Sequence, residues 1–182
     1  QLGRVEYGLS GGKSNTDFID NAGGVDCSDH EVNIKILLGE IVGAGDMTGK
    51  QRNKLLVEMT DAVGGLVLGN NYKQTQALSL AERRARERVS EYKRLMNALE
   101  AAGKLDRALE FLPTDDELNE RAANGQGLTR PELAVLISYS KIDLKESLLK
   151  SLVPDDEYLA REMETAFPPL LAKKFRSEEH TS

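Results

Sequence analysis

The sequence has no tryptophan, a single cysteine and few aromatic residues. Aromatic side chains make up 5% of the 182 residues, which argues against a base-stacking surface for nucleic acids. Cys27 alone cannot form an internal disulfide framework, so we expect a reducing compartment, the cytoplasm. No apolar run is long enough to span a membrane, and the first residues, QLGRVEYGLS, lack the apolar core of a signal peptide. The net charge of −6 disfavours general nucleic-acid binding, so we expect neither nucleic acid nor membrane as a partner.

The composition that remains is typical of a globular, helical protein, with 40% apolar and 30% charged residues. A recurring helix-start signal supports this interpretation. A hydroxyl residue is followed three positions later by Glu or Gln, the capping-box pattern, in which each side chain bonds the other's backbone N–H group. The five pairs are Ser28 with Glu31, Thr48 with Gln51, Ser79 with Glu82, Thr114 with Glu117, and Thr129 with Glu132.

Apolar residues recur at helical spacing after residue 28, whereas residues 1–25 are rich in Gly, Ser, Asn and Asp. The sequence therefore predicts a mainly α fold, a helical bundle preceded by a short irregular segment with one or two short strands. We expect helix ends at Gly43-Ala44-Gly45, Gly69-Asn70-Asn71, Gly103 and Pro113. The later helices are expected at about 80–102, 105–112, 115–124, 130–150 and 155–166, with a last piece from Pro168 and a frayed tail over 176–182.

Two glycine-rich stretches resemble nucleotide-binding motifs without completing them. Gly8-Leu-Ser-Gly-Gly-Lys13-Ser14 has Tyr7 where a phosphate loop needs its first glycine, and no buried strand precedes it. The stretch from Gly43 to Thr48 lacks the third glycine of a dinucleotide fingerprint and follows a helix rather than a strand. We interpret the first as a flexible turn and the second as a loop between helices.

Two further clusters have both a functional and a structural interpretation. Cys27-x-x-His30 is flanked by acids and could suggest zinc, but a structural zinc site needs four ligands and the only other histidine is His180, so we expect no metal. The basic run from Arg83 to Arg88 is interleaved with glutamates, which at i,i+4 spacing would neutralise much of it. It indicates a solvated or partner-docking face.

The stretch NTDFIDNAGGVDCSDHEVNIKILL, residues 15–38, combines acids, paired glycines and hydroxyls ahead of an apolar helix. We expect Asn21-Ala-Gly-Gly-Val25 to form a tight turn, since paired glycines permit positive φ. Ser28 would then stand at a helix N-terminus, where its hydroxyl and the exposed amides could cradle a carboxylate or phosphate. The alternative is that Ser28 is only a helix cap.

The same stretch resembles the large bacterial NAD-specific glutamate dehydrogenases, as do GLTRPELAVLISYSKIDLK and AFPPLL later in the chain. The resemblance implies oxidative deamination of L-glutamate to 2-oxoglutarate with NAD as cofactor. It implies that Asn21, Ala22 and Gly23 lie near the cofactor and that Val25 and Ser28 contact the substrate, Ser28 through its distal carboxylate. Asp29-His30-Glu31 departs from the aromatic-rich run that follows this serine in the small hexameric enzymes, which weakens the transfer of their pocket details.

The family's catalytic Lys and Asp and its glycine-rich turn have no counterpart in these 182 residues. The resemblance therefore implies a C-terminal piece of the enzyme that is inactive alone. Residues 1–27 would be the last edge of a Rossmann-type NAD-binding catalytic domain, 28–175 a C-terminal helical domain, and 176–182 a flexible tail. The full enzyme is expected to be a homo-oligomer. The alternative is a helical interaction or oligomerisation module without chemistry of its own.

Overall fold

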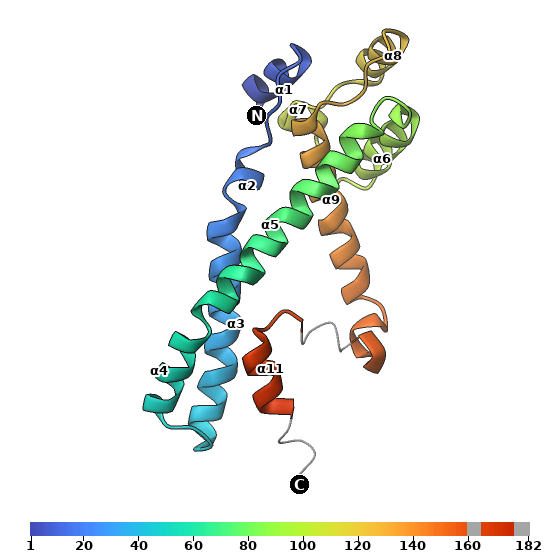
Figure 1. The fold of residues 1–182 in the computed structure, drawn as a ribbon. Helices are drawn as coiled ribbons and strands as arrows, with labels where there is room; N and C mark the ends of the chain where they lie inside the picture. The colour runs from blue at the N-terminus through green and yellow to red at the C-terminus, as the bar shows by residue number, and fades with distance from the viewer. Residues whose placement is uncertain (160–164, 177–182) are drawn as a thin grey trace. The chain divides into compact units, whose positions relative to one another are not determined.

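The computed structural model describes residues 1–159 and 165–176, and in this part of the chain all regular secondary structure is helical, with no strand (Figure 1). The predicted mainly α fold is confirmed. No helix among these residues is both long enough and apolar enough to cross a membrane. The helices are α1 (Leu2–Leu9), α2 (Asp17–Asp20), α3 (Ala22–Ala44), α4 (Gly49–Glu58), α5 (Thr60–Arg83), α6 (Val89–Ala101), α7 (Arg107–Glu110), α8 (Asp115–Ala123), α9 (Arg130–Leu149), the 3₁₀ turn η1 (Val153–Asp155) and α11 (Pro169–Arg176).

The chain divides into two compact units. Unit 1 comprises Gln1–Asp20 and Lys73–Lys150, and unit 2 comprises Asn21–Tyr72 and Ser151–Ser182. Helix α5 contributes residues to both. This division describes which residues pack together. The predicted division at residue 27 concerns the parts of a longer enzyme and stays a prediction.

The core of unit 1 is built by the apolar stripe of α6 against the first two turns of α9. Leu133, Ala134, Val135 and Leu136 are all buried in succession, so the start of α9 is enclosed on every side. Helix α8 adds Leu118, α5 adds Leu78, and α2 adds Ile19. Within the segment expected to be helical over 80–102, the apolar residues Ala85, Val89, Met96 and Leu99 are buried in this core, and Tyr92 packs against them.

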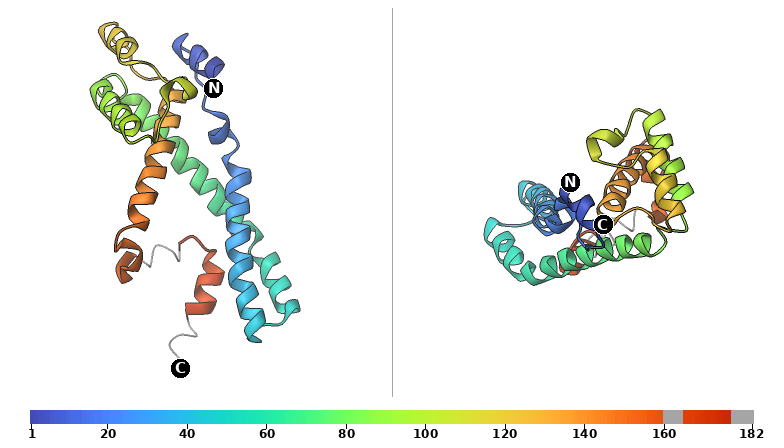
Figure 2. Two further views of the ribbon diagram at one scale, coloured as in Figure 1. Left: turned by 180° about the vertical axis from the view of Figure 1, so that it is seen from behind. Right: turned by 90° about the horizontal axis from the view of Figure 1, so that it is seen from above.

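The core of unit 2 forms where α3 and α4 lie next to each other, as both figures of the ribbon show (Figure 2). Ile34 and Leu38 of α3 pack with Leu55 and Met59, and α11 closes the cluster with Leu171. Leu37, Ile41 and Val42 pack against the cluster from the same side of α3. This is the i, i+3, i+4, i+7 pattern that the sequence predicts.

Three of the five predicted capping boxes are confirmed. Thr48 with Gln51, Thr114 with Glu117 and Thr129 with Glu132 begin α4, α8 and α9. The predictions for Ser28 and Ser79 are wrong, because both residues lie inside helices, α3 and α5. Ser79 donates its hydroxyl hydrogen to the carbonyl of Thr75 one turn earlier, which satisfies it without a cap.

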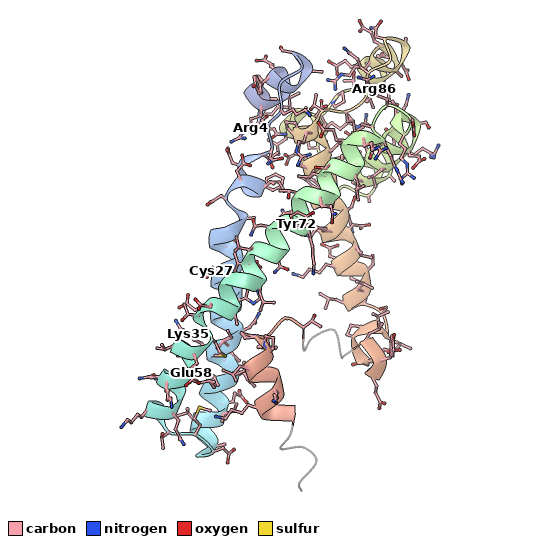
Figure 3. The ribbon with its side chains drawn as sticks, viewed as in Figure 1. Arg4, Cys27, Lys35, Glu58, Tyr72 and Arg86 are labelled. Atoms are coloured by element: carbon pink, nitrogen blue, oxygen red, sulfur yellow. The ribbon has the colours of Figure 1, made fainter. Side chains whose placement is uncertain are left out.

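The predicted strands in residues 1–25 are also wrong, since α1 and α2 occupy these residues. Arg4 of α1, which is labelled in Figure 3, orders this segment by pairing with both Asp17 and Asp20 and by donating to the carbonyl of Asn15 at 2.8 Å. A hydrogen bond from Asn15 and the charge of Arg4 hold the pKa of Asp20 below its usual value. Local ion pairs therefore stabilise short helices that the glycine content disfavours.

Helix ends were predicted correctly where a glycine takes positive φ. Gly45 ends α3 at φ 88°, and Gly103 follows α6 at φ 66°. The predicted end at Asn70-Asn71 is wrong, because α5 continues to Arg83. The Asn71 amide donates to the carbonyl of Val67 at 2.8 Å, and the Asn70 amide donates to Asp26 of α3 at 3.0 Å, so both side chains are held within the helix surface.

The expected helix over 80–102 is interrupted. Residues 84–88 form a turn between α5 and α6, and this turn holds most of the basic run. Helices at 115–124 and 130–150 are confirmed, the expected 105–112 helix is reduced to α7, and α11 matches the last predicted piece. Of the expected helix over 155–166, residues 160–164 lie outside the described part of the chain, as does the tail beyond Arg176.

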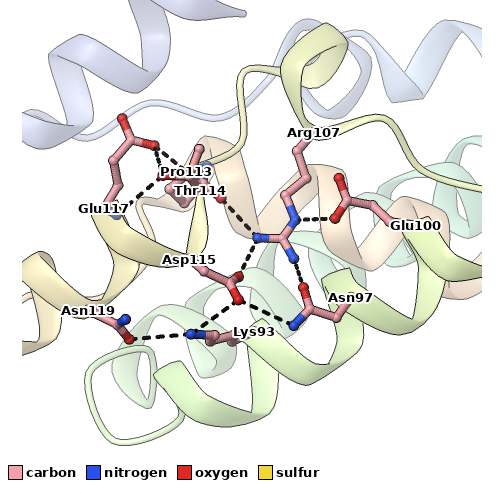
Figure 4. Close-up of polar contacts among 9 residues, drawn as sticks. All are labelled: Lys93, Asn97, Glu100, Arg107, Pro113, Thr114, Asp115, Glu117 and Asn119. Atoms are coloured by element: carbon pink, nitrogen blue, oxygen red, sulfur yellow. Dashed lines mark hydrogen bonds and ion pairs between the residues drawn. The ribbon is translucent and has the colours of Figure 1, made fainter.

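A buried guanidinium joins α6, α7 and α8 in unit 1 (Figure 4). Arg107 lies 2.8 Å from carboxylate oxygens of both Glu100 and Asp115, and it donates to Asn97 and to the carbonyl of Pro113. The hydrogen bond from Arg107 lowers the pKa of Asp115, with help from Lys93 and Asn97. The network ties the loop 102–114 to the helices on either side of it.

This network predicts a pH dependence of stability. Because the pKa of Asp115 is lower in the folded state, its contribution is present above the unfolded pKa and is lost as the pH falls through the folded value. We expect Asp115→Asn to lower the Tm at pH 7, and the gap to wild type to close only as the pH falls below the normal carboxylate range of about 4, since the folded pKa lies lower still. Thermal unfolding by circular dichroism across this range measures it. Asp116→Asn, at an exposed neighbour, is the matched control and should follow the wild-type curve; a gap that stays constant with pH would contradict the assignment.

Candidate functional site

The residues that the resemblance singles out lie on the first two turns of α3. Asn21 is the N-cap residue, with φ −101° and ψ 7°, and α3 begins at Ala22. Asn21, Val25 and Ser28 are spaced by four and three residues, so they share one face of the helix. All three are exposed, and the Val25 side chain is 61% exposed. An apolar side chain and a hydroxyl therefore stand side by side at the surface of unit 2.

The opposite face of α3 is packed. An added Cβ at Gly23 would meet Asn71 and Val67 of α5 at 3.7 and 3.9 Å, so the two helices run close together here. His30 is buried two turns further along the same face. Packing against α5 explains why Asn21 to Val25 is helical despite its glycines, since tertiary contact outweighs helix propensity. The predicted tight turn at this position is wrong.

The position of Ser28 differs from the prediction as well. It lies in the second turn of α3, where backbone amides are engaged within the helix, and not at the N-terminus. The exposed amides belong instead to the first turn, at Ala22, Gly23 and Gly24. The expected cradle of a hydroxyl with neighbouring free amides does not form. The Ser28 hydroxyl is one donor on an exposed helix face, and the positive end of the helix dipole lies about two turns away, at Ala22 and Gly23.

The Cys27-x-x-His30 cluster does not gather ligands. Cys27 is exposed and free, whereas His30 is buried with its Nε2 3.9 Å from an Asp26 oxygen (Cys27 is labelled in Figure 3). Asp26 in turn accepts the hydrogen bonds of Asn70. Within residues 1–159 and 165–176, no three His, Cys, Asp or Glu side chains come together as metal ligands could.

The glycine-rich and basic motifs lie mostly in turns and loops between helices. Of the stretch from Gly43 to Thr48, residues 45–48 form the predicted loop between α3 and α4, whereas Gly43 and Ala44 are the last residues of α3. Gly8 to Ser14 closes α1 and turns at Gly11, with φ 88°. In the basic run, Arg88 pairs with Glu91 at 3.6 Å, but Glu82 pairs with Arg130 of α9. The predicted mutual neutralisation at i,i+4 is largely wrong, because the helix is interrupted at residues 84–88.

Sequence reasoning missed the arginines that organise unit 1. The guanidinium of Arg130 donates to Ser79, Glu82 and the carbonyl of Thr75, and also to Asn15, 115 residues earlier in the chain. Arg121 donates to both carboxylate oxygens of Glu132 at 2.9 Å, and Glu132 is 0% exposed. The capping box at Thr129 was the available signal, since it placed Glu132 in the first turn of α9. Nothing local identifies its distant partner.

Comparison with protein-family models matches both ends of the chain to glutamate dehydrogenases. Residues 1–81 match the model described as bacterial NAD-glutamate dehydrogenase, catalytic domain. Residues 125–181 match the model described as glutamate dehydrogenase, C-terminal. The first match contains the whole exposed face of α3, and the second contains α9. Both matched segments thus belong to domains of glutamate dehydrogenases.

Comparison with individual curated proteins identifies the family more specifically. An NAD-specific glutamate dehydrogenase of Pseudomonas aeruginosa is 82% identical over 96% of this chain. Enzymes of the same name from Halomonas elongata and Mycobacterium tuberculosis are 58% and 42% identical over 98% and 97% of it. The chain spans 11% of the length of each relative. The chain belongs to the bacterial NAD-specific glutamate dehydrogenase family.

Proposed function

We propose that this chain is part of an NAD-dependent glutamate dehydrogenase and supplies one wall of its glutamate-binding site. In this reaction L-glutamate, NAD⁺ and water give 2-oxoglutarate, ammonium, NADH and a proton, with hydride passing from the substrate to the cofactor. The family assignment supports the reaction, since the relatives carry its name. Residues 1–27, although helical here, would belong to the edge of the Rossmann-type domain, and 28–175 to the helical domain.

The exposed face of α3 is the observation that carries the proposal. Val25 and Ser28 stand one turn apart on the side of α3 that faces away from α5, and neither is covered by other residues of unit 2. Val25 offers an apolar surface for the methylene groups of glutamate. Ser28 offers a hydroxyl donor for its distal carboxylate, a charge-assisted hydrogen bond. Each side chain type suits the part of the substrate that it would contact.

The cofactor would lie at the start of the same helix. Ala22 and Gly23 lie in the first turn of α3, whose backbone amides have no acceptor within the helix and would suit an anionic group of the cofactor. Asn21, beside them, has no capping hydrogen bond, so its amide is available to a nicotinamide or substrate. NAD supplies the hydride acceptor, and these residues would orient it. The catalytic Lys and Asp would come from other parts of the enzyme, and the 182 residues alone are expected to be inactive.

The substitution Ser28→Ala, made in an enzyme as long as the relatives, tests the proposal. We expect the KM for glutamate to rise by about tenfold or more, because a hydrogen bond to a charged group is lost, with little change in the KM for NAD⁺. Steady-state NADH formation measures both constants. Cys27→Ala, an exposed truncation one residue earlier on the helix, is the control and should leave both unchanged. An unaltered glutamate KM in Ser28→Ala would remove this residue from the pocket.

We also propose that the whole enzyme is a cytoplasmic homo-oligomer. The single cysteine favours a reducing compartment. The second half of α9 exposes Ile142, Leu144 and Leu149, each more than half exposed, which is more apolar surface than one helix usually leaves to water. These residues support the interaction-module alternative as an additional role of the same chain, alongside its part in the enzyme.

A further inference from the structure

A cavity of about 290 Å³ in unit 1 gathers positive charge. It opens between the turn after α1, the turn after α5 and the start of α9, and its charged lining residues are Lys13, Arg86, Arg130 and Glu82. Figure 3 labels Arg86 in the turn that follows α5. Three cations and one anion leave the lining with an excess of positive charge, in a chain whose net charge is −6.

The charged side chains that line this cavity differ in whether other residues of the protein already pair with them. Arg130 is fully engaged with Ser79, Asn15, a backbone carbonyl and Glu82, and Glu82 lies 3.1 Å from it. This pair is neutral as a unit. Lys13 and Arg86, in contrast, have no hydrogen bond or ion pair with any residue in 1–159 or 165–176. Two cationic donors therefore line one cavity without a protein acceptor.

The cavity is held open by close backbone packing. A Cβ at Gly127 would lie 2.6 Å from the carbonyl carbon of Ala85 and 2.8 Å from the amide nitrogen of Arg86, so the loop before α9 rests directly on the turn that carries Arg86. A Cβ at Gly8 would lie 3.0 Å from the Thr129 Cβ. The walls of the cavity therefore pack directly against one another within unit 1, and a preformed site lowers the cost of ordering a ligand.

A second cavity of about 340 Å³ adjoins the first and shares Lys13, Glu82 and Arg130 with it. Ser14 lines this second cavity, and its hydroxyl oxygen is buried with no hydrogen-bond partner. Buried polar atoms are rarely left unbonded, so this hydroxyl is a further donor for a ligand that reaches past Lys13. The unpaired donors thus lie in two neighbouring cavities that share one wall.

We propose that these cavities bind a phosphate group carried by a small molecule. Lysine and arginine donate hydrogen bonds and cannot accept them, and arginine matches the oxygens of a phosphate in pairs. The site differs from a phosphate loop, because the amides of Gly11 and Gly12 already donate to the carbonyls of Gly8 and Tyr7. Side chains rather than loop amides would hold the anion. This inference uses residues of unit 1 only and does not rest on the proposed function.

Inorganic phosphate is the probe, and its binding to the 182-residue chain is measured by isothermal titration calorimetry. We expect one saturable site. Lys13→Ala and Arg86→Ala should each weaken binding by about tenfold or more, because each removes a charged donor. Lys13→Arg should retain most of the affinity. Arg84→Ala is the matched control, since Arg84 is an exposed arginine of the same turn that does not line the cavity, and it should bind as wild type does.

Circular dichroism of each variant separates loss of binding from loss of fold, and the side chains of Lys13 and Arg86 form no hydrogen bond or ion pair within residues 1–159 and 165–176 that either substitution to alanine would remove. Absence of saturable phosphate binding in the wild type would overturn the proposal. An equal loss in Arg84→Ala and Arg86→Ala would overturn it too, because that pattern indicates general attraction to a basic turn. Neither calorimetry nor circular dichroism depends on glutamate turnover. A failure of the phosphate-site proposal can therefore be distinguished from a failure of the proposed glutamate-binding function.

Discussion

Glu132→Ala is expected to destabilise unit 1 by about 3–5 kcal/mol, because it leaves the Arg121 guanidinium without its carboxylate in a buried position. The Glu132 carboxylate is 0% exposed and accepts four hydrogen bonds, two from Arg121 at 2.9 Å and two from the backbone and hydroxyl of Thr129 at 2.7 and 2.8 Å. The substitution removes an ion pair and a helix cap together. A domain is stable by only about 5–15 kcal/mol in total, so the loss is a large fraction. Urea unfolding followed by circular dichroism measures it.

The variants around this pair separate charge from capping. Glu132→Gln keeps the shape and can still accept from Thr129, so we expect a smaller loss than in Glu132→Ala. The double variant Arg121→Met, Glu132→Leu should be less unstable than the single losses add up to, since no buried charge is left alone. A Glu132→Ala chain whose stability stays within about 0.5 kcal/mol of wild type, the range of an ordinary surface substitution, would contradict a buried pair.

Gly127→Ala is expected to cost roughly 3 kcal/mol, the upper end of what overpacking usually costs, although it adds one methyl group. The new Cβ would lie 2.6 and 2.7 Å from the carbonyl carbon and oxygen of Ala85 and 2.8 Å from the amide nitrogen of Arg86. These are backbone atoms, which cannot rotate out of the way as a side chain can. The loop before α9 would have to lift from the turn at residues 84–88. Urea unfolding gives the loss, and amide hydrogen exchange should rise in both segments.

Gly3→Ala is the control for this substitution. Gly3 lies in α1 of the same unit, and a Cβ there would meet nothing within 4 Å. Replacing a helical glycine by alanine is neutral or stabilising by up to about 1 kcal/mol. The two variants should therefore differ in sign. If Gly127→Ala were as stable as Gly3→Ala, the close approach of the two backbone segments would be refuted.

Helices after residue 28 could be predicted from the sequence because their information is local. The stripes from Ile34 to Val42 and from Val89 to Leu99 form the cores of units 2 and 1 at the expected spacing. The capping-box pattern correctly predicted the helix starts at Thr48, Thr114 and Thr129, where the N-cap is a hydroxyl residue in extended conformation. The same signal failed at Ser28 because packing on α5 extends α3 back to Ala22. Local patterns place a helix, and its neighbours decide its ends.

The candidate site was accessible to sequence reasoning only in part. The resemblance pointed to Val25 and Ser28, and helical spacing places them on one face once the start of α3 is known. Their exposure could not be predicted, because it depends on which side of α3 meets α5. The partners of Arg107 and Arg130 were equally hidden, since Asn15 and Arg130 are 115 residues apart. The hydrophobic periodicity within one segment carries no information about a contact between residues so far apart in the sequence.

Unit 1 is made of two separate stretches of the chain, because Asn21–Tyr72 of unit 2 lies between them in the sequence. Helix α1 and the loop after it therefore pack with residues that are synthesised much later. During translation, Ile19 emerges long before Leu133 and Leu136, with which it shares a core. Hairpins such as α3–α4 close over short loops and can form as soon as they leave the ribosome, whereas bringing distant segments together is slow. The part of this core that contains Ile19 can therefore be completed only after the start of α9 has been made.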